Sequence, residues 1–260
     1  MKYLYNVNDN IISVKVVNMV TTFEYKNRTV SLIPSGNPED RLVIFAGGSD
    51  PKEDVSSMEE IKKLLKPYIK KGIIEDFNLL SVSSPDWDLD YSPWKAEVSG
   101  TAFGGGADQY FCDLKAILQM DQINESIKYE KERTYFTGYS LAGLASIYGI
   151  TLPDIPYAHC ACVSGSLWFP GWTEYISEHV NDICKDSVIY ISLGSKEIKT
   201  RNPYMKENGT FCQQTDDLLK DNGVNSVFKW NNGNHFYEVD RRMARSIYSL
   251  LSSNKLEPEF

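Results

Sequence analysis

Apolar positions along the chain fall into short continuous runs and into helical repeats, and the two patterns alternate from about residue 41 onward. A short apolar run bounded by turn residues is typical of a buried strand. These runs predict strands over residues 11–17, 29–33, 41–45, 77–82, 133–139, 160–164, 188–193 and 226–230.

Between these runs, apolar residues recur every three or four positions, as on the buried face of a helix. In residues 56–69, a Ser56/Glu59 capping box predicts the helix start, and Pro67 predicts a kink or the last turn. Further helices are predicted over about residues 108–123 and from about residues 141, 173, 205 and 237. Alternating strands and helices form crossover units. We therefore predict an α/β fold, with an antiparallel N-terminal start and a mostly parallel central sheet covered on both faces.

Length and composition favour one soluble domain over residues 1–260, since 42% of the 260 residues are hydrophobic. The net charge of −8 would repel nucleic acid and anionic lipid surfaces. No apolar run approaches the ~20 residues that a membrane span needs. The N-terminal segment lacks a secretory signal pattern, and five scattered cysteines are typical of buried free thiols. We therefore expect a cytoplasmic protein, and the oligomeric state stays open.

The stretch "GYSLAG" suggests a catalytic serine. Ser140 follows a predicted strand and precedes a predicted helix, with Gly138 and Ala142 two positions away on either side. A sharp strand-to-helix turn that exposes a nucleophilic serine needs small residues at both places. The same residues would also let the helix pack closely on the sheet without any chemistry, so the stretch alone does not decide between the two readings.

A serine nucleophile needs a base, and the base needs an acid. Of the three histidines, His159 lies in an apolar strand and His179 on a polar helical surface. His235 lies on a Gly/Asn-rich loop after the last predicted strand, where the order Ser, acid, His requires it. Glu197 follows the strand over residues 188–193 and is the favoured acid. Asp216 and Asp217 are the alternatives.

Other parts of an ester site can be assigned from the same pattern. The backbone N–H groups of Leu141 and Gly48 are the predicted oxyanion donors, because one opens a helix and the other lies in the glycine pair after the strand over residues 41–45. Four large aromatic residues near predicted strand ends could line a substrate pocket: Trp94, Phe103, Trp168 and Trp172. Trp168 is favoured among them, since it comes directly off a strand.

Two clusters imitate metal sites. In "DWDLDYSPWKAE", Asp86, Asp88 and Asp90 alternate as in a calcium loop, but Tyr91 occupies the place where that loop needs glycine. We interpret the stretch as an acidic loop over the active site. His159, Cys160 and Cys162 cannot all face one metal, because adjacent strand residues point to opposite faces. The sequence therefore predicts no metal and no organic cofactor.

With these positions assigned, the chain resembles the α/β-hydrolase superfamily, and within it the esterase family that includes enterochelin esterase-like and S-formylglutathione hydrolase-like proteins. The matching segments occur in the family's order: "FAGGSD", "SPW", "FGGGADQY", "GYSLAGL", "VSGSLWFPGW", "SLGSKEIKTRNP" and "GNHF". The resemblance implies an α/β-hydrolase fold with Ser140 as nucleophile, Glu197 as acid, His235 as base and the "AGG" loop as oxyanion donor.

The expected function is a serine hydrolase that cleaves small-molecule carboxylic esters through an acyl-enzyme. An acyltransferase would use the same residues, and a noncatalytic binding protein could keep the same fold. The resemblance does not carry the substrate over, because family members that act on siderophores or sugar esters differ in their pocket residues.

Overall fold

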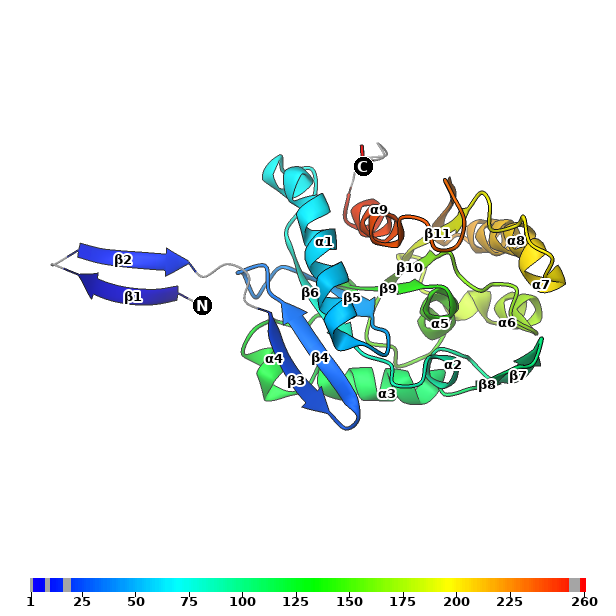
Figure 1. The fold of residues 1–260 in the computed structure, drawn as a ribbon, viewed down its shortest axis with the longest axis horizontal. Coiled ribbons are helices and arrows are strands. Elements are labelled where there is room, and N and C mark those ends of the chain that lie inside the picture. Colours follow the sequence, from blue (N-terminus) through cyan, green and yellow to red (C-terminus); the bar gives the residue numbers. More distant parts are fainter. Residues whose placement is uncertain (1, 8–9, 16–19, 253–257) are drawn as a thin grey trace.

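The computed structural model describes residues 2–7, 10–15, 20–252 and 258–260. An eight-stranded sheet in the order β12-β11-β10-β9-β5-β6-β4-β3 crosses the molecule (Figure 1). Its strands are β3 (Thr21–Tyr25), β4 (Arg28–Ile33), β5 (Arg41–Ala46), β6 (Phe77–Val82), β9 (Thr134–Tyr139), β10 (His159–Val163), β11 (Val188–Gly194) and β12 (Asn225–Asn231). Strand β4 pairs antiparallel with both of its neighbours, and all other pairings are parallel.

Helices cover both faces of this sheet. Helices α1 (Pro51–Lys70) and α9 (Val239–Leu251) pack on one face, in a core that includes Val43 and Leu79. The other core includes the next residues along the same strands, Ile44 and Leu80, and packs against four further helices. These are α3 (Ala107–Ile117), α5 (Leu141–Ile150), α6 (Trp172–His179) and α8 (Asn208–Asp221). Alternate side chains of a strand point to opposite faces, so a strand buried on both sides is apolar throughout.

Smaller elements connect or flank these layers. They are the pairs β1 (Lys2–Val7) with β2 (Asn10–Lys15) and β7 (Lys95–Val98) with β8 (Thr101–Gly104), the helices α2 (Trp87–Asp90), α4 (Asp121–Asn124) and α7 (Pro203–Lys206), and the 3-10 turns η1 (Lys131–Arg133) and η2 (Val180–Asp182). The α/β fold with a mostly parallel sheet and an antiparallel start is confirmed.

Several predicted boundaries are wrong. Helix α1 begins at Pro51, because the Asp50 side chain accepts from the Lys52 N–H, and Pro67 lies in its last turn. The predicted helix over residues 108–123 is two helices, α3 and α4. The predicted strand over residues 11–17 is β2, which pairs with β1 in a separate two-stranded sheet, and residues 16–17 lie outside the described residues.

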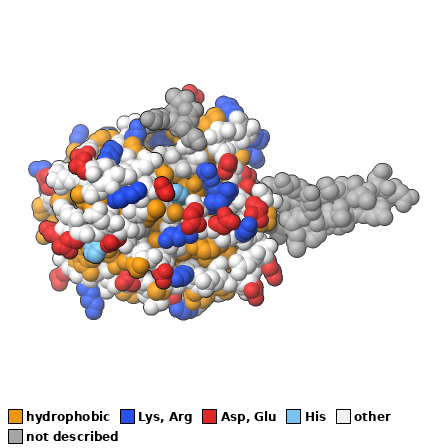
Figure 2. Space-filling model, turned by 180° about the vertical axis from the view of Figure 1, so that it is seen from behind, with side chains coloured by type: hydrophobic (Ala, Val, Ile, Leu, Met, Phe, Trp, Pro, Cys, Tyr) orange, Lys and Arg blue, Asp and Glu red, His pale blue; other side chains and the backbone are white. Residues whose placement is uncertain are grey.

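The cysteines agree in part with the prediction of buried free thiols. All five cysteines are free, but Cys112 and Cys184 are exposed, which corrects the prediction that all are buried. Acidic, basic and apolar side chains are interspersed over the face seen in Figure 2. In the described part of the chain, every helix is too short or too polar to span a lipid bilayer.

Candidate active site

Ser140 stands on a strained turn between β9 and α5. Its φ of 57° and ψ of −122° lie in a region that side-chain-bearing residues rarely adopt. Surrounding contacts hold this conformation, since the Ser140 N–H donates to the Val163 carbonyl at 3.0 Å. A Cβ atom at Gly138 would lie 2.1 Å from the Ala142 carbonyl oxygen. The turn therefore requires a residue without a side chain at Gly138.

Three side chains that follow different strands form one hydrogen-bonded chain. His235 Nε2 lies 3.1 Å from Ser140 Oγ, and His235 Nδ1 lies 2.7 Å from Glu197 Oε2. Ser140 follows β9, Glu197 follows β11 and His235 follows β12, so all three lie at the carboxyl edge of the parallel sheet. The structure brings together the three residues that the sequence singled out.

Glu197 is a carboxylate with every oxygen engaged. Its Oε1 accepts from the Gly194 N–H at 2.7 Å and from the Ser164 hydroxyl at 2.8 Å, while Oε2 faces His235. Burial raises the pKa of Glu197, but the hydrogen bond and charge of His235 and the bonds from Gly194 and Ser164 outweigh it, so the pKa lies below the ordinary value. Glu197 is therefore an anion at neutral pH.

The alternative bases have structural partners elsewhere. His159 Nδ1 accepts from the Val188 N–H at 3.1 Å, so Nε2 carries the proton and donates to the Glu132 carbonyl, also at 3.1 Å. Burial lowers the pKa of His159. His179 is half exposed and pairs with Asp182 at 2.8 Å.

The alternative acids are also engaged away from His235. Asp216 is buried, ion-paired with Lys220 at 2.5 Å and bonded to the Ser226 hydroxyl at 2.6 Å. Asp217 accepts from Gln213 at 2.9 Å.

One predicted oxyanion donor needs correction. Leu141 is the first residue of α5, where backbone N–H groups have no acceptor within the helix. The Gly48 N–H instead donates to Asp54 Oδ1 at 2.8 Å, so the assignment of Gly48 as a free donor is wrong in this structure. No pattern in the sequence marks this contact, because Asp54 reaches back from the first turn of α1.

Known structures share this architecture. Over 90% of this chain and 80% of the other, the structure superposes on an IroE-like serine hydrolase from Shewanella oneidensis with a TM-score of 0.71 and 15% identity. The enterobactin esterase FES from Shigella flexneri gives a TM-score of 0.64 at 13% identity, over 91% and 60% of the two chains. The chain has the α/β-hydrolase fold. The resemblance seen in the sequence motifs is confirmed at this level.

Sequence comparison is less informative for this α/β-hydrolase-fold chain. No protein-family model matches it. It is 22% identical over 166 residues to the uncharacterised protein YbbA of Bacillus subtilis, and the match spans 62% of this chain and 66% of that protein. A feruloyl esterase module from Clostridium thermocellum is a further structural neighbour, with a TM-score of 0.62 and 13% identity over 90% of this chain and 87% of the other.

A cavity of about 340 Å³ opens beside Ser140 in this hydrolase fold. Its other lining residues are Ser164, Ser166, Trp168, Lys196, Glu197, Lys199, Thr200, Met205, Asn208, Asn234, His235 and Phe236. Of the four aromatic residues expected here, only Trp168 lines it.

The other three, Trp94, Phe103 and Trp172, pack against residues away from the cavity lining. Trp172 is 1% exposed and donates to the Thr215 hydroxyl, Phe103 packs edge-on against Phe169, and the Trp94 indole donates to the Pro170 carbonyl. Their assignment to the pocket is corrected, because large aromatics near strand ends can also be buried beneath the loops.

The acidic stretch over residues 86–97 is also corrected. Asp86 accepts from the Leu89 N–H as the cap of α2, and Asp90 is buried in an ion pair with Arg28 at 2.7 Å. Among the described residues, none of this stretch lines the cavity beside Ser140, and no group of histidine, cysteine and acidic residues could hold a metal ion.

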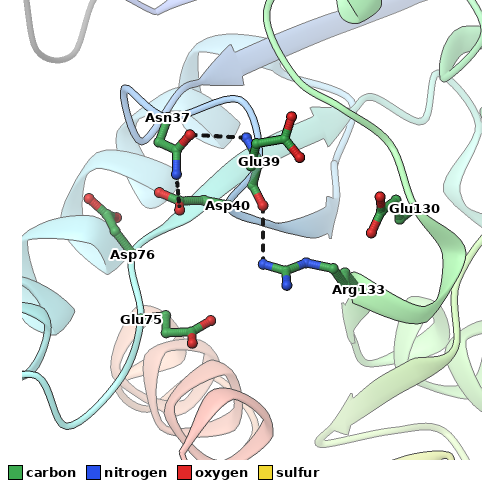
Figure 3. A pocket seen from close by; sticks show the side chains of 7 residues that line it. All are labelled: Asn37, Glu39, Asp40, Glu75, Asp76, Glu130 and Arg133. Carbon is green, nitrogen blue, oxygen red and sulfur yellow. Dashed lines mark hydrogen bonds between the residues drawn. The ribbon is translucent and has the colours of Figure 1, made fainter.

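A second cavity of about 490 Å³ lies at the opposite edge of the sheet of this α/β-hydrolase fold, before β5, β6 and β9 (Figure 3). It is lined mainly by carboxylates, and Arg133 donates across it to the Glu39 carbonyl. Lysines pair with several of these carboxylates, as Lys62 does with Asp76 at 2.7 Å. It has no nucleophile and base of the kind found beside Ser140.

Two residues that contact Glu197 beside Ser140 were not predicted from the sequence. Ser164 directly follows β10, so the rule that site residues come after strands could have found it. Arg242 lies in α9 with no exposed surface, and its guanidinium bonds to both Glu197 and Ser164. In the sequence it is one basic residue on an amphipathic helix, and nothing marks it out.

Proposed function

We propose that this protein is a serine hydrolase that cleaves carboxylic esters of small molecules through an acyl-enzyme on Ser140. The observation that carries the proposal is the continuous hydrogen-bonded chain from Ser140 Oγ through His235 to Glu197 Oε2, with distances of 3.1 and 2.7 Å. It opens onto a cavity large enough for a small acyl or alcohol group. Structural neighbours whose names describe ester hydrolysis, such as the enterobactin esterase, support the proposal.

In the first half-reaction, Ser140 Oγ attacks the ester carbonyl carbon while neutral His235 takes its proton at Nε2. The Glu197 carboxylate holds the ring by its Nδ1–H and stabilises the imidazolium that forms. Backbone N–H groups at the start of α5, with Leu141 first, stabilise the tetrahedral oxyanion. Collapse of this intermediate breaks the ester C–O bond, and His235 returns the proton to the departing alcohol.

In the second half-reaction, water replaces the alcohol. His235 takes a proton from the water as it attacks the acyl carbon, and then returns one to Ser140 as the acid leaves. Glu197 serves both halves because its lowered pKa keeps it ionised throughout the neutral range.

Labelling and turnover test this proposal together. A fluorophosphonate probe should label native protein at Ser140, and p-nitrophenyl esters of different acyl length should be cleaved with release of equal amounts of alcohol and free acid. Ser140→Ala should abolish both labelling and cleavage. Label mapped to another residue would contradict the assignment, and acyl transfer to an added alcohol in place of free acid would favour an acyltransferase.

A further inference from the structure

Arg242 is a buried cation beside the acid of the proposed site. Its side chain has no exposed surface, and Nη1 donates to Glu197 Oε1 at 3.0 Å and to the Ser164 hydroxyl oxygen at 2.9 Å. Ser164 in turn donates to the same Glu197 oxygen at 2.8 Å. With the Gly194 N–H, three donors fix Oε1, so the carboxylate cannot rotate away from the imidazole at Oε2.

The other terminal nitrogen of Arg242 holds the loop that carries the base. Nη2 donates to the carbonyls of Asn232 and Asn234 at 2.7 and 2.8 Å. Asn234 directly precedes His235, and this loop turns through Gly233 at a φ of 91°. One planar guanidinium therefore joins the acid, which follows β11, to the backbone of the base, which follows β12. Only arginine has two terminal nitrogens set in such a rigid fork.

We propose that Arg242 is a positioning residue for catalysis, which fixes the distance between Glu197 and His235 and balances part of the carboxylate charge. The inference rests on the proposed function. Arg242 touches neither Ser140 nor the cavity among the described residues, so its effect passes through Glu197 and the loop before His235.

The charge of Arg242 affects the pH dependence of the reaction, separately from the positioning by its two terminal nitrogens. Among the described residues, His235 and Arg242 contact Glu197, Tyr139 and Cys212 lie close enough to feel its charge, and Lys196 and Lys199 line the same cavity. Burial raises the pKa of Tyr139 and of Cys212, so both are neutral at the pH of an assay. Arg242 is the buried cation bonded directly to Glu197, so it competes with the imidazolium of His235 for that carboxylate. Its removal takes away one cation beside Glu197, so the acidic limb of the pH–rate profile should move to higher pH.

The test compares Arg242→Met and Arg242→Lys with wild type on p-nitrophenyl butyrate. Arg242→Met should lower kcat at least about tenfold, with a much smaller change in KM, and shift the acidic limb upward. Arg242→Lys keeps the charge but not the fork, so it should lower kcat while the limb stays in place. Arg245→Gln, in the same helix and ion-paired with Glu238, should keep both kcat and the limb.

The outcomes separate this inference from the proposed function. If wild type cleaves the ester no faster than Ser140→Ala, the proposed function fails whatever Arg242 does. Suppose that the wild type is active and that Arg242→Met folds. If this variant then keeps the wild-type kcat and the same acidic limb of the pH–rate profile, Arg242 has only a structural role. If Arg242→Met does not fold, Arg242→Lys decides. A wild-type kcat in Arg242→Lys would overturn the inference, and a reduced kcat with the acidic limb at the wild-type pH would support it.

Discussion

Ser140, Glu197 and His235 differ in how firmly their surroundings hold them. Glu197 is fixed by bonds to each of its oxygens, and Ser140 by the backbone turn that carries it. His235 has Glu197 on one ring nitrogen and Ser140 on the other, so its orientation depends on both. At the scale of single residues, the histidine is where the proposed mechanism can be examined most directly.

His235 is the proposed general base. kcat/KM should rise with pH as the imidazole loses its proton, because only the neutral ring can accept the serine proton. His235→Ala should lower kcat by about 10⁴-fold or more and remove this acidic limb, leaving a weak rate from binding and the oxyanion donors. The measurement is a pH series of initial rates on one activated ester.

His159→Ala and His179→Ala are the controls for this series. His159 bonds the Val188 N–H and the Glu132 carbonyl, so its loss should lower thermal stability while the acidic limb persists. The assignment would be wrong if His235→Ala kept the limb and one of these variants lost it.

At the scale of elements, the turn from β9 to α5 is the most demanding piece of local structure. Gly138 faces the Ala142 carbonyl, and Gly143 approaches Gly165, so the helix lies close against the strand ends. Small residues let the backbone reach the strained conformation at Ser140 without collision. The stability of this turn and the exposure of the serine should therefore be lost together.

Gly138→Ala tests this coupling. The added Cβ atom would lie 2.1 Å from the Ala142 carbonyl oxygen, so the backbone must shift, at a cost of about 1–3 kcal/mol in the free energy of unfolding. Denaturant unfolding should show this loss, and fluorophosphonate labelling should fall sharply.

Gly48→Ala is the matched stability control for Gly138→Ala. Its Cβ atom would meet no atom closer than Asp54 Oδ1 at 3.6 Å, an ordinary contact. Its free energy of unfolding should change by less than about 1 kcal/mol. Equal stability of wild type and Gly138→Ala would show that the turn tolerates a side chain.

At the scale of the whole molecule, the charge of the cavity beside Ser140 differs from that of the chain. The net charge is −8, yet Lys196 and Lys199 line the cavity and form no salt bridge within the described ranges. Glu197 is the carboxylate among its lining residues, and His235 and Arg242 face its two oxygens. A substrate that carries an anion should therefore be attracted to the site.

This difference predicts a preference among esters. p-Nitrophenyl hydrogen glutarate should have a kcat/KM about fivefold above that of p-nitrophenyl pentanoate at low salt, since one exposed ion pair contributes about 1 kcal/mol in water. The ratio should fall as ionic strength rises. Lys196→Gln with Lys199→Gln should remove the preference, and Lys66→Gln on α1 should keep it. A ratio that neither salt nor the double variant changes would contradict this reading.

The sequence by itself determined the alternation of the long strands and helices from β5 onward, the elbow around Ser140 and the loops that carry Glu197 and His235, while the short elements β3, β7, β8 and α2 were not predicted. Each of these depends on neighbours in the chain: apolar period, small residues at fixed spacing, and position after a strand. Tertiary structure alone decided that Asp54 occupies the Gly48 N–H, that Trp172 is buried away from the cavity, and that Arg242 reaches Glu197. These contacts join residues from separate elements, and their partners are selected by how the helices pack on the sheet, which no local pattern encodes.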